Sequence, residues 1–167
     1  MHSIIHKLEA VSEARHLVVL GSVDSDLSKI GLSKVEHDFV TSKLAIGELS
    51  IHINQYSRSI FIEVLQEGTT IVNNLEKARE RGAKLVKQLN EAKIEEVELI
   101  SLSSRDLSLY VAEGMALANY KFLKYFSSPE KKRNSLKVIF IHAESSAIKN
   151  MNAVISGTLY ARDFVNE

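Results

Sequence analysis

Hydrophobic and polar positions along the first third of the chain change from a strand-like to a helix-like period. The apolar run at 16–21 predicts a buried strand, and the polar stretch 21–31 that follows predicts a loop. Ser33 and Glu36 have the spacing of a capping box, which marks the start of a helix, and Gly47 suits the position just past its end. The side of this helix expected to face the core consists of Val35, Phe39, Val40 and Leu44.

The middle of the chain predicts a β-hairpin followed by a long amphipathic helix. Strand-forming residues occur at 51–53 and again at 60–65, with a polar turn between them. Thr69 or Thr70 is placed to cap the helix that follows. Gly82 lies within the apolar stripe of this helix, where we expect its missing side chain to permit close packing on a strand. The stripe consists of Val72, Leu75, Ala78, Gly82, Leu85, Val86 and Leu89.

Two further strand–helix units make up the rest of the chain. Residues 97–102 have the pattern of a strand, and 103–106 then open a helix with a capping pattern. After a polar loop, a strand at 136–141 leads to a last helix that begins at Ser145 or Ser146. The apolar positions of the first of these two helices are Leu107, Val111, Met115, Ala118, Phe122 and Tyr125.

This order of elements predicts an α/β fold. Strands that alternate with long helices imply a mixed, largely parallel sheet flanked by helices on both faces, and the hairpin supplies the antiparallel pair. With 167 residues, no internal repeat and no long linker, residues 1–167 are expected to form a single domain.

Composition excludes several classes of function. Apolar residues make up 45% and charged residues 25% of the chain, which is ordinary for a globular protein. Lys plus Arg and Asp plus Glu both number 21, so the net charge is zero and no overall field draws the chain to nucleic acid or an anionic membrane. The absence of Cys excludes thiolate nucleophiles, disulfides and Cys-based metal sites. Apolar runs are far shorter than the roughly 20 residues of a membrane span, and no secretory signal is evident, so we expect a cytoplasmic protein.

Candidate chemistry is sparse. The chain contains no phosphate-binding loop, no Gly-x-Ser-x-Gly elbow and no His-Glu-x-x-His motif. Asp24 and Asp26 follow the first predicted strand and His142 follows the last, at the strand ends where open α/β sheets bind ligands. These three residues are the candidates for ligand contact. A short basic cluster at 131–133 is typical of a solvated surface. The alternative is a contact with the phosphates of a nucleic acid.

Two stretches of the second half carry more specific patterns. The first, at 111–125, contains an Ala-Glu-Gly run followed by spaced Ala, Tyr, Phe and Tyr residues, and the second, at 157–167, contains Ala-Arg-Asp followed by Asn-Glu. Their order and separation resemble two motifs of the leucyl (cytosol) aminopeptidases, a family of two-metal exopeptidases. The motif residues, to which the resemblance gives structural and not catalytic roles, are Glu113, Gly114, Tyr120, Phe122, Tyr125, Arg162, Asp163 and Asn166.

The resemblance implies that this chain is the N-terminal domain of a leucyl-aminopeptidase-like protein with a macro-domain-like fold. In the family this domain precedes the catalytic domain and supports the assembly of hexamers. Its implied partners are therefore its own catalytic domain and the neighbouring subunits of a homo-oligomer. The two Zn or Mn ions are expected in that catalytic domain, with no cofactor in this chain. The clustered carboxylates and lysine that hold such ions are missing from the sequence, so we expect no peptidase activity from these residues alone.

Two other functions remain open. Macro-type domains often bind ADP-ribose, so the chain could be a free-standing domain for a nucleotide-type ligand, although it lacks glycine-rich phosphate loops. Some relatives in the aminopeptidase family also bind DNA, which the zero net charge argues against.

Overall fold

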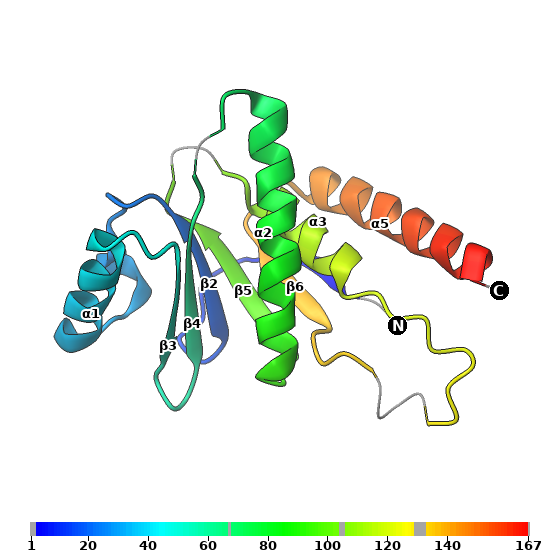
Figure 1. The fold of residues 1–167 in the computed structure, drawn as a ribbon, viewed down its shortest axis with the longest axis horizontal. Coiled ribbons are helices and arrows are strands. Elements are labelled where there is room, and N and C mark those ends of the chain that lie inside the picture. Colours follow the sequence, from blue (N-terminus) through cyan, green and yellow to red (C-terminus); the bar gives the residue numbers. More distant parts are fainter. Residues whose placement is uncertain (1–2, 67, 104–105, 129–132, 167) are drawn as a thin grey trace.

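The fold is built on one six-stranded sheet. In the computed structural model, which describes residues 3–66, 68–103, 106–128 and 133–166, the strands lie in the order β1-β6-β5-β2-β4-β3 (Figure 1). The strands are β1 (Ile4–Lys7), β2 (His16–Gly21), β3 (Ser50–Asn54), β4 (Ser59–Val64), β5 (Glu96–Ser101) and β6 (Val138–Ile141). Every neighbouring pair is parallel except β3 and β4, which form the predicted hairpin. The mixed, largely parallel sheet is therefore confirmed.

The structure adds one strand, β1, that the hydrophobic pattern does not predict. Ile5 alone of its four residues is buried, so the segment shows no alternation to recognise. It is a strand because β6 offers it an edge: the Ile4 amide donates to the Lys137 carbonyl at 2.9 Å, and the Ser3 hydroxyl donates to the Leu136 carbonyl at 3.0 Å. A strand of this kind is set by its neighbour and not by its own sequence.

Helices cover both faces of the sheet, as predicted. α2 (Ile71–Glu91), α3 (Ser108–Ala118) and α5 (Ser145–Asn166) pack on one face around a core that includes Phe61, Leu99 and Met115. α1 (Lys34–Ala45) and the short 3-10 helix η1 (Leu27–Ile30) enclose a second core on the other face, around Leu17 and Ile62 (Figure 1).

The start of α1 follows the predicted capping box. The Glu36 amide donates to the Ser33 hydroxyl at 3.3 Å, and the Ser33 amide donates to the Glu36 carboxylate at 2.7 Å. Gly47 follows the helix with a φ of 84°, a conformation that glycine adopts without strain. Similarly, the Thr70 side chain caps α2.

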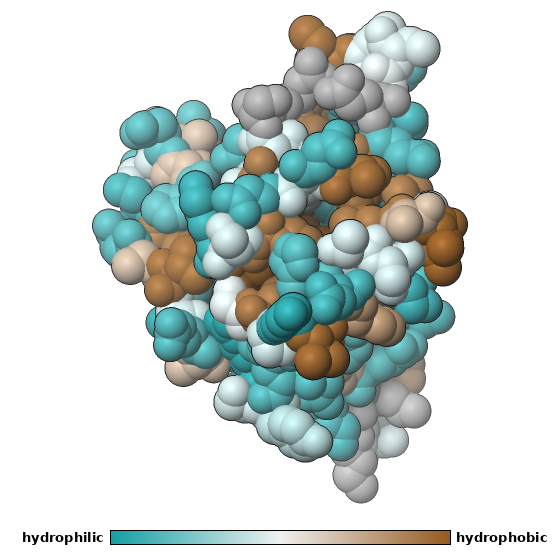
Figure 2. Space-filling model, turned by 90° about the vertical axis from the view of Figure 1, so that its left-hand side faces the viewer, coloured by the Kyte–Doolittle hydropathy of each residue, from teal (hydrophilic) through white to brown (hydrophobic). Residues whose placement is uncertain are grey.

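The predicted core side of α1 is only half right. Val40 and Leu44 are buried, but Val35 and Phe39 are 79% and 43% exposed, because α1 rests on the sheet along one narrow side. The predicted loop at 21–31 also contains η1, which Leu27 and Ile30 anchor in the core. Figure 2 looks at this side of the molecule and shows apolar side chains scattered among polar ones.

α2 and α3 cross so closely that each needs a glycine at the crossing. A Cβ on Gly82 would lie 2.1 Å from the Val111 carbonyl oxygen, and a Cβ on Gly114 would lie 2.1 Å from the Arg79 carbonyl oxygen. The strand that we expected against Gly82 is thus a wrong prediction, since its neighbour is α3. Val72 is also misassigned: it is 72% exposed because the first turn of α2 extends beyond the sheet (Figure 1).

α3 ends at Ala118 and does not continue to Tyr125 as predicted. The next residue, Asn119, is 4% exposed, and its side-chain amide donates to the Ser3 hydroxyl at 2.7 Å and to the Leu136 carbonyl at 2.8 Å. These distant partners hold the chain out of the helical path. Tyr125 is therefore exposed and not part of the core, and Ala118, the last residue of α3, is exposed as well. Of the predicted helix start at 103–106, residues 104–105 lie outside the described residues.

α5 begins at Ser145, as predicted, and extends away from the sheet toward the C-terminus (Figure 1). The Asn152 amide fastens it to β1, donating to the Ile5 carbonyl at 2.8 Å and accepting from the Ile5 amide at 3.1 Å. Within the described residues, neither α5 nor any other helix combines the length and the apolar character that a membrane crossing requires.

Candidate functional site

The first motif contributes a partly buried ion pair that joins α3 to α2. Arg79 donates from Nε to the Glu113 carboxylate at 2.7 Å, and its guanidinium also lies over the Tyr110 ring. Burial lowers the pKa of Arg79, but the hydrogen bond and charge of Glu113 outweigh it and leave that pKa raised. Glu113 is 8% exposed, and its carboxylate is engaged by Arg79. Sequence reasoning missed Arg79, because nothing near it in the chain indicates a partner on another helix.

The two motifs meet where α5 passes the end of α3. The Tyr120 hydroxyl donates to the Asp163 carboxylate at 2.7 Å, and Arg162 donates to the Leu117 carbonyl at 2.9 Å. The Asn166 amide donates to the Arg162 carbonyl at 2.7 Å. Desolvation, and then the hydrogen bond to Asp163, raise the pKa of Tyr120. We call Leu117, Tyr120, Arg162, Asp163 and Asn166 the motif junction.

The remaining motif residues lie beyond this junction. Phe122 and Tyr125 pack edge to face, with ring centroids 5.5 Å apart, but Tyr125 is 70% exposed. Glu167, the last residue of the second motif, lies outside the described residues. The structure therefore brings part of the two motifs together and leaves Phe122 and Tyr125 on the segment after α3.

The three ligand-contact candidates do not form one site. Asp26 caps η1 by accepting the Ser28 amide at 3.0 Å, and that hydrogen bond lowers its pKa. Asp24 lines a shallow cavity between its own loop and α1, beside His37. His142 is exposed at the end of β6, and β5 separates that strand from β2, which precedes both aspartates.

The carboxyl ends of the central strands do enclose a small cavity. It lies between the loops after β2, β4 and β5, where the strand order switches from one side of β2 to the other. The residues that line it include Ser22, Gln66, Asn74 and Ser103. Its volume is about 60 Å³. Leu65 and Leu107 from the surrounding loops also line this cavity, which is far smaller than the roughly 300–1,000 Å³ of most small-molecule sites.

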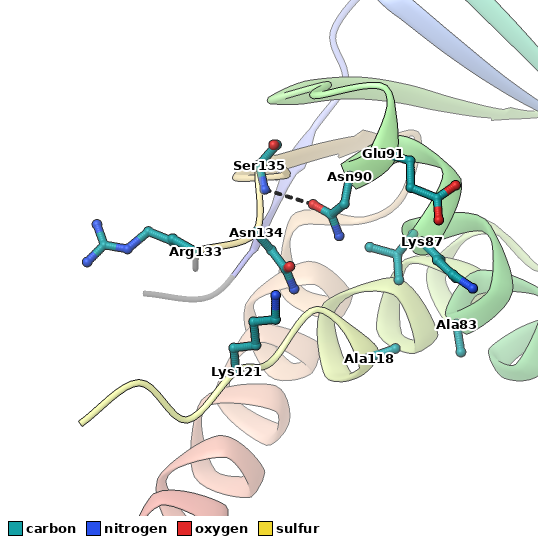
Figure 3. Close-up of a pocket in the computed structure, with 10 residues that line it drawn as sticks. Ala83, Lys87, Asn90, Glu91, Ala118, Lys121, Arg133, Asn134 and Ser135 are labelled. Atoms are coloured by element: carbon teal, nitrogen blue, oxygen red, sulfur yellow. Dashed lines mark hydrogen bonds between the residues drawn. The ribbon is translucent and has the colours of Figure 1, made fainter. Parts of the chain in front are cut away.

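A larger hollow of about 450 Å³ lies at the opposite end of the helical layer (Figure 3). Lys87, Lys121 and Arg133 bring positive charge to its rim, but the Lys121 side chain is directed toward Asn134 and Arg133 points away from the hollow. The hollow also lies at the C-terminal ends of α2 and α3, where helix dipoles favour cations. Residues 131–132 of the basic cluster lie outside the described residues.

The floor of this hollow is a network of amide side chains. Asn90 accepts the backbone amides of Ser135 and Leu136 at 2.8 and 3.0 Å, and donates to the Asn119 side chain at 2.8 Å. Asn134 in turn donates to the Asn119 carbonyl at 2.9 Å. Because these groups bond to one another, the network fixes the chain that enters β6 and leaves few donors for a ligand.

The described residues contain no group of three or more His, Asp or Glu side chains placed to hold a metal ion. Zn and Mn were expected in a catalytic domain and not in this chain, and that expectation stays a prediction.

Comparison with known proteins identifies solved structures of similar fold. No protein-family model matches the sequence, and no curated protein matches it significantly. Among solved structures, a mutant of tomato leucine aminopeptidase is similar over 100% of this chain and 38% of its own, with a TM-score of 0.68 and 13% identity. An alphavirus structure titled "P23pro-zbd" is similar over 95% of this chain and 24% of its own, with a TM-score of 0.50 and 10% identity. This chain thus has the fold of a part of a leucine aminopeptidase and spans well under half the length of that protein.

Proposed function

We propose that this chain is the N-terminal accessory domain of a leucyl-aminopeptidase-like protein and is not itself catalytic. The observation that carries the proposal is the motif junction, in which the Tyr120 hydroxyl and the Asp163 carboxylate bond at 2.7 Å. The residues that carry the sequence resemblance thereby meet in space. The likeness of fold to an aminopeptidase over the whole of this chain supports the same reading.

In this proposal the domain serves assembly and access to the active sites. The peptidase chemistry, with two Zn or Mn ions, belongs to a catalytic domain that follows the junction, and the partners of the accessory domain are that domain and neighbouring subunits. The described residues supply ion pairs and amide networks that hold helices together, and these suit a rigid supporting domain.

The test is to sequence the source transcript beyond the codon for Glu167. We expect an open frame that continues into a segment with clustered Asp, Glu and Lys codons for metal ligands. A stop codon directly after Glu167 would overturn the proposal. As a second test, the chain alone with added Zn or Mn should not hydrolyse a leucyl anilide, and turnover that co-purifies with it would show that it is catalytic.

The two alternative functions are less well supported. A nucleotide-type ligand such as ADP-ribose would need a far larger crevice than the cavity of about 60 Å³ at the strand ends. Calorimetric titration with ADP-ribose should therefore show no binding in the micromolar range. For DNA, the basic side chains of Lys87, Lys121 and Arg133 around the hollow of about 450 Å³ do not converge on a common point (Figure 3). A salt-dependent shift of duplex DNA by this chain would revive that function.

A further inference from the structure

α5 is apolar on two opposite sides. Ile148, Ile155 and Leu159 face the core, whereas Val154, Tyr160, Phe164 and Val165 are 57%, 74%, 73% and 83% exposed. At 3.6 residues per turn, Gly157, Ala161 and Phe164 lie on the side of the helix opposite the core, and Val154 and Tyr160 flank them. We call Ala153, Val154, Gly157, Tyr160, Ala161 and Phe164 the outer face of α5. Because large apolar side chains gathered on one exposed side of a helix usually mark an interaction surface, we infer that this face is covered by a partner.

Gly157 indicates what kind of structure covers it. Glycine in the middle of an exposed helix is unfavourable, and nothing lies within 4 Å of the position that its Cβ would occupy. The other two glycines inside helices, Gly82 and Gly114, each lie against the backbone of a crossing helix. Gly157 sits between Ala153 and Ala161, one turn away on either side, so the outer face offers the same close approach to a further helix.

We propose that the outer face of α5 binds the same face of a second copy of this chain, with the two helices antiparallel and crossing at Gly157. The α2–α3 crossing provides the precedent, since Gly82 and Gly114 there face each other's helices reciprocally. With a two-fold axis at Gly157, the Gly157 of each copy faces the helix of the other copy, as Gly82 and Gly114 do. The same axis places Val154 of each copy beside Tyr160 of the other.

Charge favours this arrangement. The stretch 150–161 contains no charged residue, so two copies can meet along it without desolvating an ion. An antiparallel pair also places Lys149 of each copy near the C-terminal end of the other α5, where the helix dipole favours a cation. A partner with a charged surface would find no complementary group along this stretch, whereas an identical uncharged face fits it.

The contact is small, and the dimer is correspondingly weak. A 22-residue helix is about 33 Å long, and one helix–helix contact of that length buries less than the roughly 800 Å² per partner of a stable interface. We therefore expect a dimer that dissociates in the micromolar range. The inference does not depend on the relation to aminopeptidases, because it concerns the surface of this chain alone.

The experiment is sedimentation equilibrium of the purified chain from low micromolar to submillimolar concentration. We expect the average mass to rise from that of one chain toward twice that value. Gly157→Glu should abolish the rise without loss of the fold, because it adds a charge at the crossing while replacing a glycine by a better helix former. Ser156→Glu is the matched control: it adds the same charge to an exposed neighbour about 100° around the helix, and should still dimerise. A wild-type chain that stays monomeric, or a Gly157→Glu variant that associates as strongly as wild type, would overturn the proposal.

Discussion

Replacing Gly114 by Ala should destabilise the protein, although the same change in most helices is stabilising. A Cβ at this position would lie 2.1 Å from the Arg79 carbonyl oxygen and 2.7 Å from the Arg79 Cα. Ordinary contacts of a Cβ begin near 3.4 Å, so α2 and α3 must separate by about 1 Å at their crossing. The obstacle is backbone and cannot swing aside, as the end of a flexible side chain could.

The magnitude follows from two opposing effects. Overpacking in a closely packed core destabilises by roughly 1–3 kcal/mol and occasionally more, and a clash with backbone belongs at the upper end of that range. The gain in helix propensity from Gly to Ala offsets about 1 kcal/mol. We therefore expect Gly114→Ala to lower the free energy of unfolding by about 2 kcal/mol.

Gly157→Ala provides the matched control, since it is the same substitution inside another helix. Its Cβ would meet nothing within 4 Å, so the propensity gain is unopposed and the variant should be more stable than wild type by about 0.5–1 kcal/mol. Urea unfolding followed by circular dichroism, at concentrations below those that favour dimers, measures both changes. If Gly114→Ala were as stable as Gly157→Ala, the close crossing of α2 and α3 would be refuted.

Two further predictions concern buried polar groups. Burial raises the pKa of the Glu63 carboxyl, against the pull of the Ser50 hydroxyl at 2.7 Å and of Arg81 at 3.1 Å. The folded state therefore holds this proton more tightly than the unfolded state, and stability should fall, by at most about 1.4 kcal/mol per pH unit, as pH rises from the unfolded pKa through the folded one. Unfolding of Glu63→Gln across that range should lack this part of the slope, and an unchanged slope would contradict the assignment. Asn119→Ala removes the amide that bonds to the Ser3 hydroxyl and the Leu136 carbonyl, which keep only the bond between them, and it leaves the Asn90 amide without its acceptor. The free energy of unfolding should therefore drop by about 1–3 kcal/mol in the same urea assay; an unchanged value would show that water replaces the amide.

Several parts of the fold could be predicted because their signals are local. The capping box of α1 joins Ser33 to Glu36 across one turn, and Thr70 caps α2 in the same way. The strand β2 is recognisable because all its central residues are apolar and buried. Each of these patterns depends on neighbours within a few residues, which the sequence places together whatever the rest of the chain does.

The predictions that failed depend on distant contacts. Val35 was assigned to the core by its spacing, but spacing cannot tell how wide a strip of α1 the sheet covers. α3 was extended to Tyr125 because the apolar period continues, but Asn119 bonds to Ser3 and Leu136, which lie far away in the sequence. The ion pair between Arg79 and Glu113 could not be foreseen for the same reason.

The sequence by itself determined the class of fold, the order of most elements and the two motifs that suggest an aminopeptidase relation, since all of these are expressed in local period and residue type. Only the tertiary structure decided that β1 is a strand, that Gly82 and Gly114 belong to one crossing, and that Tyr120 meets Asp163. The tertiary structure also leaves the outer face of α5 exposed. The physical reason is that edge pairing, helix crossing and burial depend on which surfaces meet, and that is settled when the whole chain packs.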